Sequence, residues 1–390
     1  MVLIGSYVAK CVYAAYRLFQ NGTFVELRIG DDAAGFFRVA RESYIGYFEN
    51  YVMNYPHILN AEFHVFGVNY FCAMLVNVLL ESIAAVAVCR ALTLLEVQGR
   101  PRRLGVLVIS FAPYVIISSS EILREPVYTC FISLSLCVFV SYLRRGGLSR
   151  LVRSVLLMMP VIALHGGYFP IAVTYLALGG FSHRPGGLDK DNLLTRIVCA
   201  LLIVVSIAVV GAIDPKGIMN SLGNPEELLD RISGNSLHRT TMEAGSAYLL
   251  WLKTPTWPTA ILASPLKALF YLLSPLPMNW RWITDIVAFL LNSSVHLFFL
   301  FAMYRLFLKD RSPRSESETR ESRKVLWTVA KAVLVSVLLC AVLFGFDTHN
   351  AGTALRHRDA VIPMEAVGIS ICMALMQSGQ NSQSRRKSVR

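Results

Sequence analysis

Apolar runs long enough to cross a membrane recur along most of the chain, separated by short polar or charged stretches. A helix needs about 20 mainly apolar residues to cross roughly 30 Å of hydrocarbon. The pattern therefore predicts an all-α, polytopic transmembrane helical bundle of about 9–11 membrane segments, some of them broken or re-entrant. The predicted segments are residues 65–89, 104–120, 126–143, 154–180, 195–213, 257–277, 283–307, 325–346 and 360–377. Residues 1–19 form either a short first span or a truncated one, because Lys10 and Arg17 interrupt them.

Two of these segments contain helix-breaking residues. Segment 154–180 is interrupted by a His-Gly-Gly sequence that begins at His165, and segment 257–277 carries several prolines. Each is either a kinked span or a hairpin. If both are hairpins, the long polar loop 214–256 lies on the outer side of the membrane, and if both span, it lies in the cytoplasm. Basic residues in the short loop 181–196 favour the hairpins.

The stretch 20–63 is predicted to be an external loop that contains one amphipathic helix. Asp31 and Asp32 precede apolar residues that recur at helical spacing, and either aspartate would cap the start of the helix. The apolar positions are Ala33, Phe36, Phe37, Ala40 and Tyr44. Such a helix is expected to lie along the membrane surface.

Composition supports one integral membrane domain over residues 1–377, followed by a basic, disordered tail over residues 378–390. The 390 residues are 55% hydrophobic and 16% charged, with a mean hydropathy of +0.52. The net charge of +12 does not indicate nucleic-acid binding, because basic residues of membrane proteins gather in cytoplasmic loops. The linker 308–324 is such a loop. The eight cysteines are scattered, so the sequence predicts neither a disulfide framework nor a metal site.

Three charged features are predicted on the outer side of the membrane. They are Asp31 and Asp32, the turn with Glu121, Arg124 and Glu125, and the polar loop with Arg356, His357 and Arg358. A carboxylate there could act as a general base on an acceptor hydroxyl. Arginines could hold a pyrophosphate in a bidentate manner and stabilise its charge as it leaves.

Each of these features also has a plain structural interpretation. Asp31 is a suitable helix cap, and the turn of residues 121–125 could be a solvated connection with one ion pair. Arg356 and Arg358 could anchor the chain to lipid headgroups.

Polar side chains also fall inside the predicted membrane segments. Asn77 and Glu81 lie one helical turn apart on segment 65–89. A carboxylate at that depth is costly and is a functional candidate, although it can also be a hydrogen-bonded residue of the bundle interior. His165 lies beside a glycine pair, which indicates either a cavity or a hairpin tip, or is simply a buried structural histidine.

Several short motifs resemble the GT-C superfamily of glycosyltransferases that use polyprenyl-linked sugars. Gly30-Asp31-Asp32 followed by an aromatic-rich helix is similar to the first external loop of that superfamily, in which an acidic residue is the usual catalytic base. Segments 119–126, 163–168, 273–277 and 350–358 resemble parts of bacterial O-antigen and exopolysaccharide polymerases. The resemblance departs from the family in the short first span and in loop 214–256, which contains no recognisable soluble domain.

The resemblance implies sugar transfer from a polyprenyl-phosphate-linked donor at the outer face of the bacterial cytoplasmic membrane, as part of cell-surface polysaccharide biosynthesis. The expected partners are this lipid-linked glycan and the bilayer, with no nucleic acid. No cofactor is predicted, and a divalent cation is left open. Two other functions remain: a transporter or flippase of lipid-linked glycans, in which the broken segments form the substrate site and Glu81 couples protons, and a non-catalytic membrane partner of the polysaccharide machinery.

Overall fold

The computed structural model describes residues 1–21, 32–45, 55–181, 196–204, 247–249, 251–252, 254, 256–309, 317–348 and 350–388. These residues form helices and no strand, which confirms the predicted all-α class. Asp31 lies outside the described residues.

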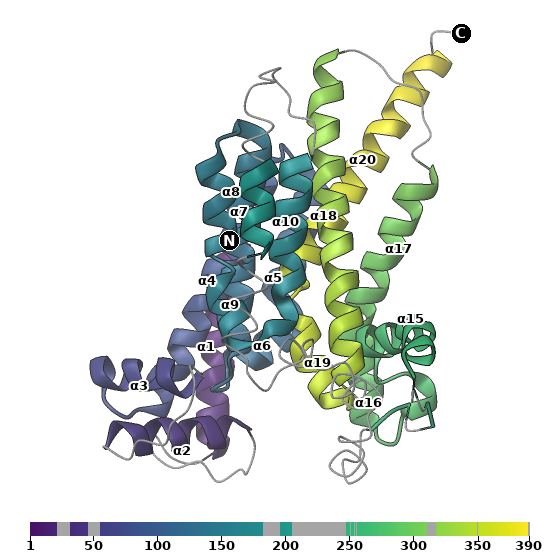
Figure 1. Cartoon of the computed structure of the whole chain (residues 1–390). Helices are drawn as coiled ribbons and strands as arrows, with labels where there is room; N and C mark the ends of the chain where they lie inside the picture. Colours follow the sequence, from purple (N-terminus) through teal and green to yellow (C-terminus); the bar gives the residue numbers. More distant parts are fainter. Residues whose placement is uncertain are drawn as a thin grey trace.

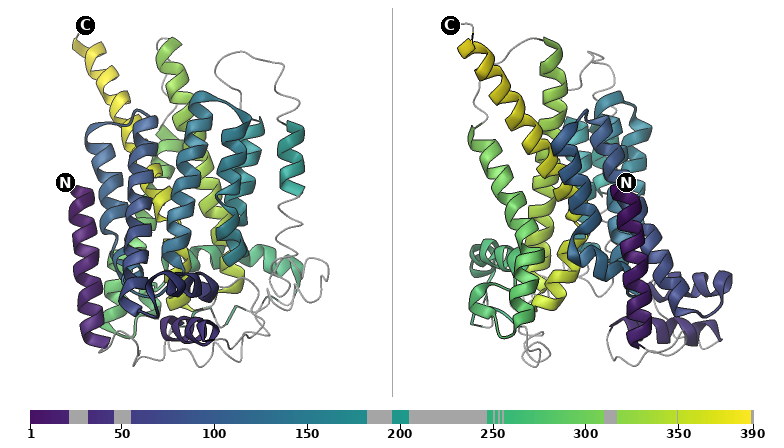
Figure 2. Two further views of the ribbon diagram at one scale, coloured as in Figure 1. Left: turned by 90° about the vertical axis from the view of Figure 1, so that its left-hand side faces the viewer. Right: turned by 180° about the vertical axis from the view of Figure 1, so that it is seen from behind.

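In the first half of the bundle, helices such as α4 and α7 run between its two ends, while α2 and α3 lie across one end (Figures 1 and 2). We call the end at which α7 begins the lower end, and the end at which α7 finishes the upper end, as drawn in Figure 1. The helices are α1 (Val2–Asn21), α2 (Asp32–Tyr44), α3 (Tyr55–Phe66), α4 (Tyr70–Leu94), α5 (Gly99–Phe111), α6 (Pro113–Ser119), α7 (Glu125–Arg145), α8 (Leu148–Leu156), α9 (Met159–Leu164), the 3-10 turn η1 (Gly166–Tyr168) and α10 (Phe169–Phe181).

The second half begins at the lower end with α15 and closes the bundle with three long helices. α17 and α20 rise from the lower end and α18 descends, and α20 lies between α17 and α18 in contact with both (Figure 1). The elements are α15 (Trp257–Leu273), the 3-10 turn η3 (Pro277–Asn279), α16 (Ile283–Ala288), the π-helical turn η4 (Phe289–Ser293), α17 (Ser294–Lys309), α18 (Ser317–Asp347), α19 (Ala351–Asp359) and α20 (Ile362–Ser388). α20 thus continues into the tail that composition predicts to be disordered.

Five helices among the described residues are long and apolar enough to cross a membrane. Two further candidates are bent pairs, α5 with α6 at 42° and α19 with α20 at 62°, so the number rises to seven if each pair is one span. Of the other predicted segments, 257–277 contains the shorter apolar helix α15, 154–180 contains α9, most of α10 and the end of α8, and residues 205–213 of segment 195–213 lie outside the described residues. This composition is that of a multi-pass membrane protein.

Residues 148–181 form a hairpin, which was one of the two predicted alternatives for this segment. Tyr128, near the start of α7, donates a hydrogen bond to the carbonyl oxygen of Leu164 at 3.4 Å. Tyr142, near the other end of α7, donates to the carbonyl oxygen of Gly179 at 2.7 Å. The chain therefore descends through α8 and α9, turns at His165, and returns along α10.

α15 lies across the lower end of the bundle and does not run through it (Figure 2, left). Its backbone approaches α18 closely, because a Cβ atom added at Gly345 would lie 2.9 Å from the nitrogen of Ala268. Before α15, Ala247 pairs with Asn350 in an isolated β-bridge, and Tyr248 donates to the carbonyl oxygen of Thr348 at 3.0 Å. The described part of loop 214–256 therefore lies at the lower end.

We expect Gly345→Ala to lower the free energy of unfolding by about 1–3 kcal/mol, the usual cost of overpacking. The new methyl group would meet backbone atoms of Lys267 and Ala268, and backbone cannot rotate away as a flexible side chain can. Thermal unfolding in detergent measures the effect. Gly5→Ala is the matched control, because it is also helical and its Cβ would meet nothing within 4 Å. Equal stability of the two variants would contradict the close contact between α15 and α18.

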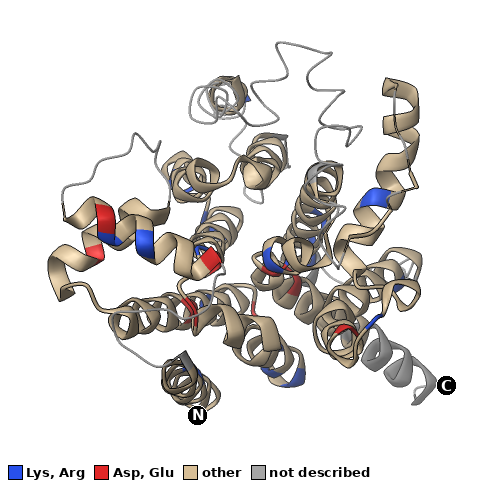
Figure 3. Cartoon of the chain, turned by 90° about the horizontal axis from the view of Figure 1, so that it is seen from below, with Lys and Arg blue, Asp and Glu red and all other residues tan. Residues whose placement is uncertain are grey.

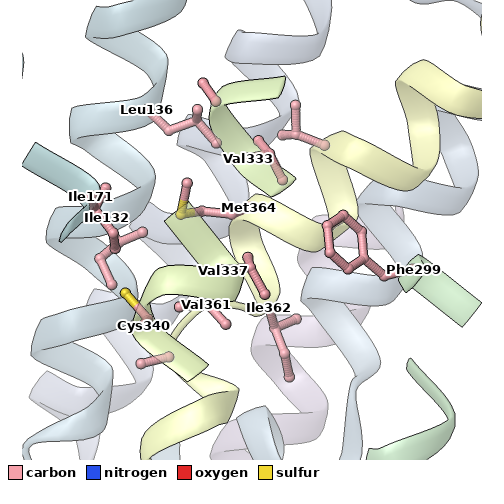
Figure 4. Packing of buried hydrophobic residues seen from close by; sticks show 14 of the residues in the cluster. Ile132, Leu136, Ile171, Phe299, Val333, Val337, Cys340, Val361, Ile362 and Met364 are labelled. Atoms are coloured by element: carbon pink, nitrogen blue, oxygen red, sulfur yellow. The ribbon is translucent and has the colours of Figure 1, made fainter. Parts of the chain in front are cut away.

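Buried apolar side chains of α7, α10, α17, α18 and α20 meet in the middle of the bundle (Figure 4). Helix association inside a membrane depends on close packing, because lipid is as apolar as the helix surface. Small residues provide it here: Gly105 lies against Ala366 and Ser370 of α20, and Gly368 lies against Phe299 and Met303 of α17.

α1 is a candidate span with a polar inner face. Its outer face exposes large apolar side chains such as Ile4, Val8 and Val12. Its inner face buries Ser6 and Lys10, and Ser6 donates to the carbonyl oxygen of Ser110 at 2.7 Å. Lys10 therefore faces the bundle and not lipid, which explains how a lysine is accommodated within this span.

The amphipathic helix predicted after Asp31 is present as α2, but a second helix covers its apolar face. Ala33, Phe37 and Ala40 are buried, as predicted. Phe37 makes edge-to-face ring contacts with Phe63 of α3 and Tyr70 of α4. This face therefore packs against protein, where the sequence predicted a membrane surface.

Candidate functional site

Three charged side chains that are distant in sequence meet at the lower end of the bundle. Arg356 of α19 forms ion pairs with Asp32 of α2, through Nη1 and Oδ2, and with Glu125 of α7, through Nε and Oε1 at 3.2 Å. The side chain of Asp32 is 62% exposed, that of Arg356 is 20% exposed, and that of Glu125 is 2% exposed. We call Asp32, Glu125 and Arg356 the Arg356 cluster. Seen from this end, acidic and basic positions adjoin one another near the middle of the bundle (Figure 3).

Each member of the Arg356 cluster lies at or near the end of a helix. Asp32 and Glu125 are in the first turns of α2 and α7, where the partial positive charge of a helix N-terminus favours a carboxylate. Arg356 is in the last turn of α19, where the opposite dipole favours a cation. Asn350 caps α19, and its Oδ1 accepts a hydrogen bond from the Gly352 amide at 2.8 Å.

The polar segment of residues 350–359 is a helix, whereas the sequence predicted a loop. Successive helical residues are rotated by about 100°, so residues two apart point to nearly opposite sides. Arg356 accordingly faces Asp32 and Glu125, while Arg358 is fully buried on the other side. There it donates to the carbonyl oxygens of Tyr271 and Leu272 at 3.1 and 2.8 Å. The two arginines, which were predicted to share one phosphate, lie in different environments.

The turn between α6 and α7 is held by a buried amide. Asn77 Nδ2 donates to the carbonyl oxygens of Glu121 and Leu123 at 2.7 and 3.2 Å. The carboxylate of Glu121 forms an ion pair with Arg17 of α1. Asn77 therefore fixes the backbone that leads into Glu125, a role that the sequence could not show.

Two histidines lie beside each other in an aromatic layer. The ring centroids of His165, at the tip of the α9–α10 hairpin, and His357 of α19 are 4.7 Å apart. Tyr168 donates to the carbonyl oxygen of His357 at 2.7 Å. Arg124 interacts electrostatically with both rings. All three were predicted as substrate-binding residues: Arg124 and His357 adjoin Glu125 and Arg356 in the chain, and His165 comes from the hairpin tip.

The intramembrane carboxylate of Glu81 has a cationic neighbour. Glu81 of α4 and Lys10 of α1 are both fully buried and interact electrostatically. Lys10 Nζ has no hydrogen-bond partner among the described residues. The pair does not include Glu125 or Arg356.

Sequence reasoning missed two residues near the Arg356 cluster. Arg17 pairs with Glu121, and its position in an otherwise apolar run was the available signal. Tyr114 of α6 interacts electrostatically with Glu125, Arg356 and Asp359, and nothing in its local sequence distinguishes it from other tyrosines at membrane interfaces. In the part of the chain that the structure describes, no group of three or more His, Cys, Asp or Glu side chains is arranged to hold a metal ion.

Outside the candidate spans, burial raises the pKa of the Glu62 carboxyl to about 7. Glu62 lies on α3, and its charge acts on Tyr55, whose hydroxyl lies 3.4 Å from Asn77 Oδ1. The Glu62 carboxyl therefore titrates near neutral pH in the folded protein. No described residue hydrogen-bonds to Glu62 Oε2.

This shift predicts a pH-dependent stability. The folded state binds the Glu62 proton more tightly than the unfolded state, so this stabilisation is present below about pH 4.5 and is lost as pH rises through about 7. Glu62→Gln should remove the dependence, making the variant relatively more stable at about pH 8 by on the order of 1 kcal/mol after discounting for partial exposure. Thermal unfolding of the wild type and the variant at about pH 4.5 and at about pH 8 tests this. Parallel curves for the wild type and the variant would contradict it.

The Arg356 cluster contains a carboxylate that could act as a base and a guanidinium that could bind phosphate. In the structure these two groups are paired with each other. Arg356 is paired with two carboxylates, of which Asp32 is the more exposed. An incoming phosphate could replace Asp32 on Arg356, which would free the Asp32 carboxylate beside the bound phosphate. No family model, no curated protein and no solved structure matches this chain.

Proposed function

We propose that the protein is a membrane-embedded glycosyltransferase with a GT-C-like architecture, acting on polyprenyl-phosphate-linked sugars in surface-polysaccharide assembly. The observation that carries the proposal is the contact of Arg356 with Asp32 and Glu125. It brings a candidate base and a candidate phosphate-binding group together at one end of a bundle whose flanks are apolar. The motif resemblance supplies the substrate class.

The charge distribution supports an extracytoplasmic site. The upper end carries the basic residues at the start of α5 and the end of α7, including Arg100, Arg103, Arg144 and Arg145. Basic loops favour the cytoplasm, which directs the lower end and the Arg356 cluster to the opposite face. A lipid-linked donor would then present its phosphate at the membrane surface while its chain remains in the bilayer.

In the proposed reaction, Arg356 holds the phosphate and Glu125 holds Arg356. Asp32 accepts the proton of the acceptor hydroxyl, whose oxygen forms a bond to the anomeric carbon of the donor sugar. The bond from that carbon to the phosphate oxygen breaks, and the electron pair stays on the phosphate, where Arg356 stabilises the charge. Arg356 contacts two carboxylates and is only 20% exposed, which argues against a simple headgroup anchor.

The experiment that tests this proposal replaces the candidate base. We expect Asp32→Asn to stop the release of polyprenyl phosphate or pyrophosphate from membranes supplied with undecaprenyl-linked sugar donors, because an amide cannot accept the proton. Glu42→Gln is the matched control, since Glu42 is an exposed acid on the same helix. Asp31→Asn decides which neighbouring aspartate acts. Full release by both Asp→Asn variants at normal protein level would refute the assignment of the base.

A flippase of the same lipid-linked glycans is a second candidate, favoured by the buried Lys10–Glu81 pair. Ionisable residues within membrane segments often mark ion or proton pathways. Transport of a fluorescent lipid-linked glycan across vesicles would then require Glu81, and Glu81→Gln would abolish its response to a pH gradient. Glycan release without such transport would favour the transferase.

A further inference from the structure

A second group of ionisable side chains lies inside the bundle, apart from the contacts of the Arg356 cluster. His296 of α17 is fully buried, and both of its ring nitrogens contact carboxylates. Nε2 lies 3.0 Å from Asp359 Oδ1 at the end of α19, and Nδ1 lies 2.8 Å from Glu365 Oε1 in the first turn of α20. These residues surround the 62° bend between α19 and α20.

The contacts of His296 with Asp359 and Glu365 determine how many protons these three side chains hold. A neutral imidazole has one N–H, so it can donate to only one of two ionised carboxylates. The other contact would set a ring lone pair against a carboxylate lone pair. The arrangement therefore requires one additional proton, either on the ring, giving an imidazolium, or on one of the two carboxyl groups. That proton can move between His296, Asp359 and Glu365 without changing the net charge.

The charged and titratable groups near this proton come from α6, α15 and α19. Arg358 of α19 lies 3.8 Å from Asp359 Oδ1 and donates to Ser293 Oγ of η4 at 2.9 Å. Tyr114 of α6 and Tyr271 of α15 interact electrostatically with Asp359. With Arg358 and His296 charged and both carboxylates ionised, the formal charges cancel. Arg358 forms an ion pair with Asp359 and also interacts electrostatically with Glu365.

Three polar atoms of this group have no hydrogen-bond partner within the described chain: Asp359 Oδ2, Glu365 Oε2 and Arg358 Nε. Buried polar atoms are normally satisfied, so open atoms at both ends of the line leave places where a proton donor such as water can bind. A fixed ion-pair network would be expected to use these atoms.

We propose that Asp359, His296 and Glu365 form a proton-binding relay buried between α17, α19 and α20. When His296 is neutral with its proton on Nδ1, a proton that arrives at Asp359 passes to Nε2 of His296 while the proton on Nδ1 passes to Glu365, so one proton enters at Asp359 and one is displaced to Glu365. Tyr114, which interacts with both Asp359 and Arg356, lies on the side of the Arg356 cluster. The relay does not depend on the transfer chemistry proposed above. Chains of Asp, Glu and His inside membranes are typical of proton-coupled proteins.

The test is infrared difference spectroscopy of the full chain in vesicles of phosphatidylethanolamine and phosphatidylglycerol. Acidification from about pH 8 to about pH 5, the range in which histidine-linked groups titrate, should produce the C=O stretch of a carboxylic acid. Glu365→Gln should remove this band. The background variant is Glu62→Gln, because Glu62 titrates in the same range and would add its own band.

His296→Gln gives an independent readout if Glu365→Gln does not fold. Without the imidazolium, the ring can no longer exchange a proton with either carboxyl group, so the difference in the acid band between the two ends of the pH range should vanish. A wild-type spectrum without an acid band that depends on Glu365 or His296 would show that the group is a fixed ion-pair network, and the relay would be refuted.

Discussion

Replacing Arg356 with alanine is expected to lower the rate of sugar transfer by roughly 30- to 1000-fold. Removing a charge-assisted contact to the leaving phosphate costs on the order of 2–4 kcal/mol of transition-state stabilisation. Arg356→Lys should restore only part of the rate, because a point charge cannot reproduce the planar, bidentate fork. The rate is measured as the release of polyprenyl phosphate or pyrophosphate from a lipid-linked donor, normalised to the amount of folded protein.

The structure adds a control that the sequence could not suggest. Arg356→Ala leaves Glu125, whose side chain is only 2% exposed, without its cation, and an uncompensated buried charge destabilises the fold. The double variant Arg356→Ala/Glu125→Gln removes that charge. It should recover stability but not activity. A lipid-anchor role predicts something different: Arg356→Lys would act as the wild type, and the double variant would remain active.

Replacing Arg358 with alanine is expected to lower the free energy of unfolding by about 3–5 kcal/mol, the range found when one partner of a buried charge pair is removed. Arg358 donates to two carbonyl oxygens of α15 and to Ser293, and it lies beside the carboxylate of Asp359. Alanine would leave those acceptors unpaired and the carboxylate uncompensated. Thermal or denaturant unfolding in detergent, together with the yield of folded protein, measures the loss.

Arg38→Ala is the matched control for this effect. Arg38 is exposed on α2, and exposed substitutions usually change stability by less than about 0.5 kcal/mol. If Arg358→Ala instead kept wild-type stability and lost transfer activity as Arg356→Ala does, Arg358 would belong to the phosphate site as first predicted. The two arginine variants thus separate a structural cation from a functional one only two positions away.

The amino-acid sequence by itself determined the class of protein and the position of most membrane segments. Backbone N–H and C=O groups in lipid must form their hydrogen bonds within the same segment, and a helix does this. Long apolar runs are therefore expected to be helical. The candidate spans Tyr70–Leu94, Glu125–Arg145 and Ser322–Phe346 lie close to the predicted ones. The same local logic placed α2, because Asp32 and the spacing of Ala33, Phe37 and Ala40 define its start and its buried face.

The tertiary structure alone decided which charged residues meet. Arg356 reaches Asp32 and Glu125 across sequence separations of 324 and 231 residues, and no local pattern encodes such pairings. The tertiary structure also decided that the side chains of Arg356 and Arg358 point to opposite sides, because this depends on whether residues 350–359 form a loop or a helix. His296 shows the same limit: within its own apolar run it is a single histidine, and only the bend between α19 and α20 brings two carboxylates to its ring. Hydropathy is a property of each segment, whereas ion pairs depend on how whole helices are rotated and placed against one another.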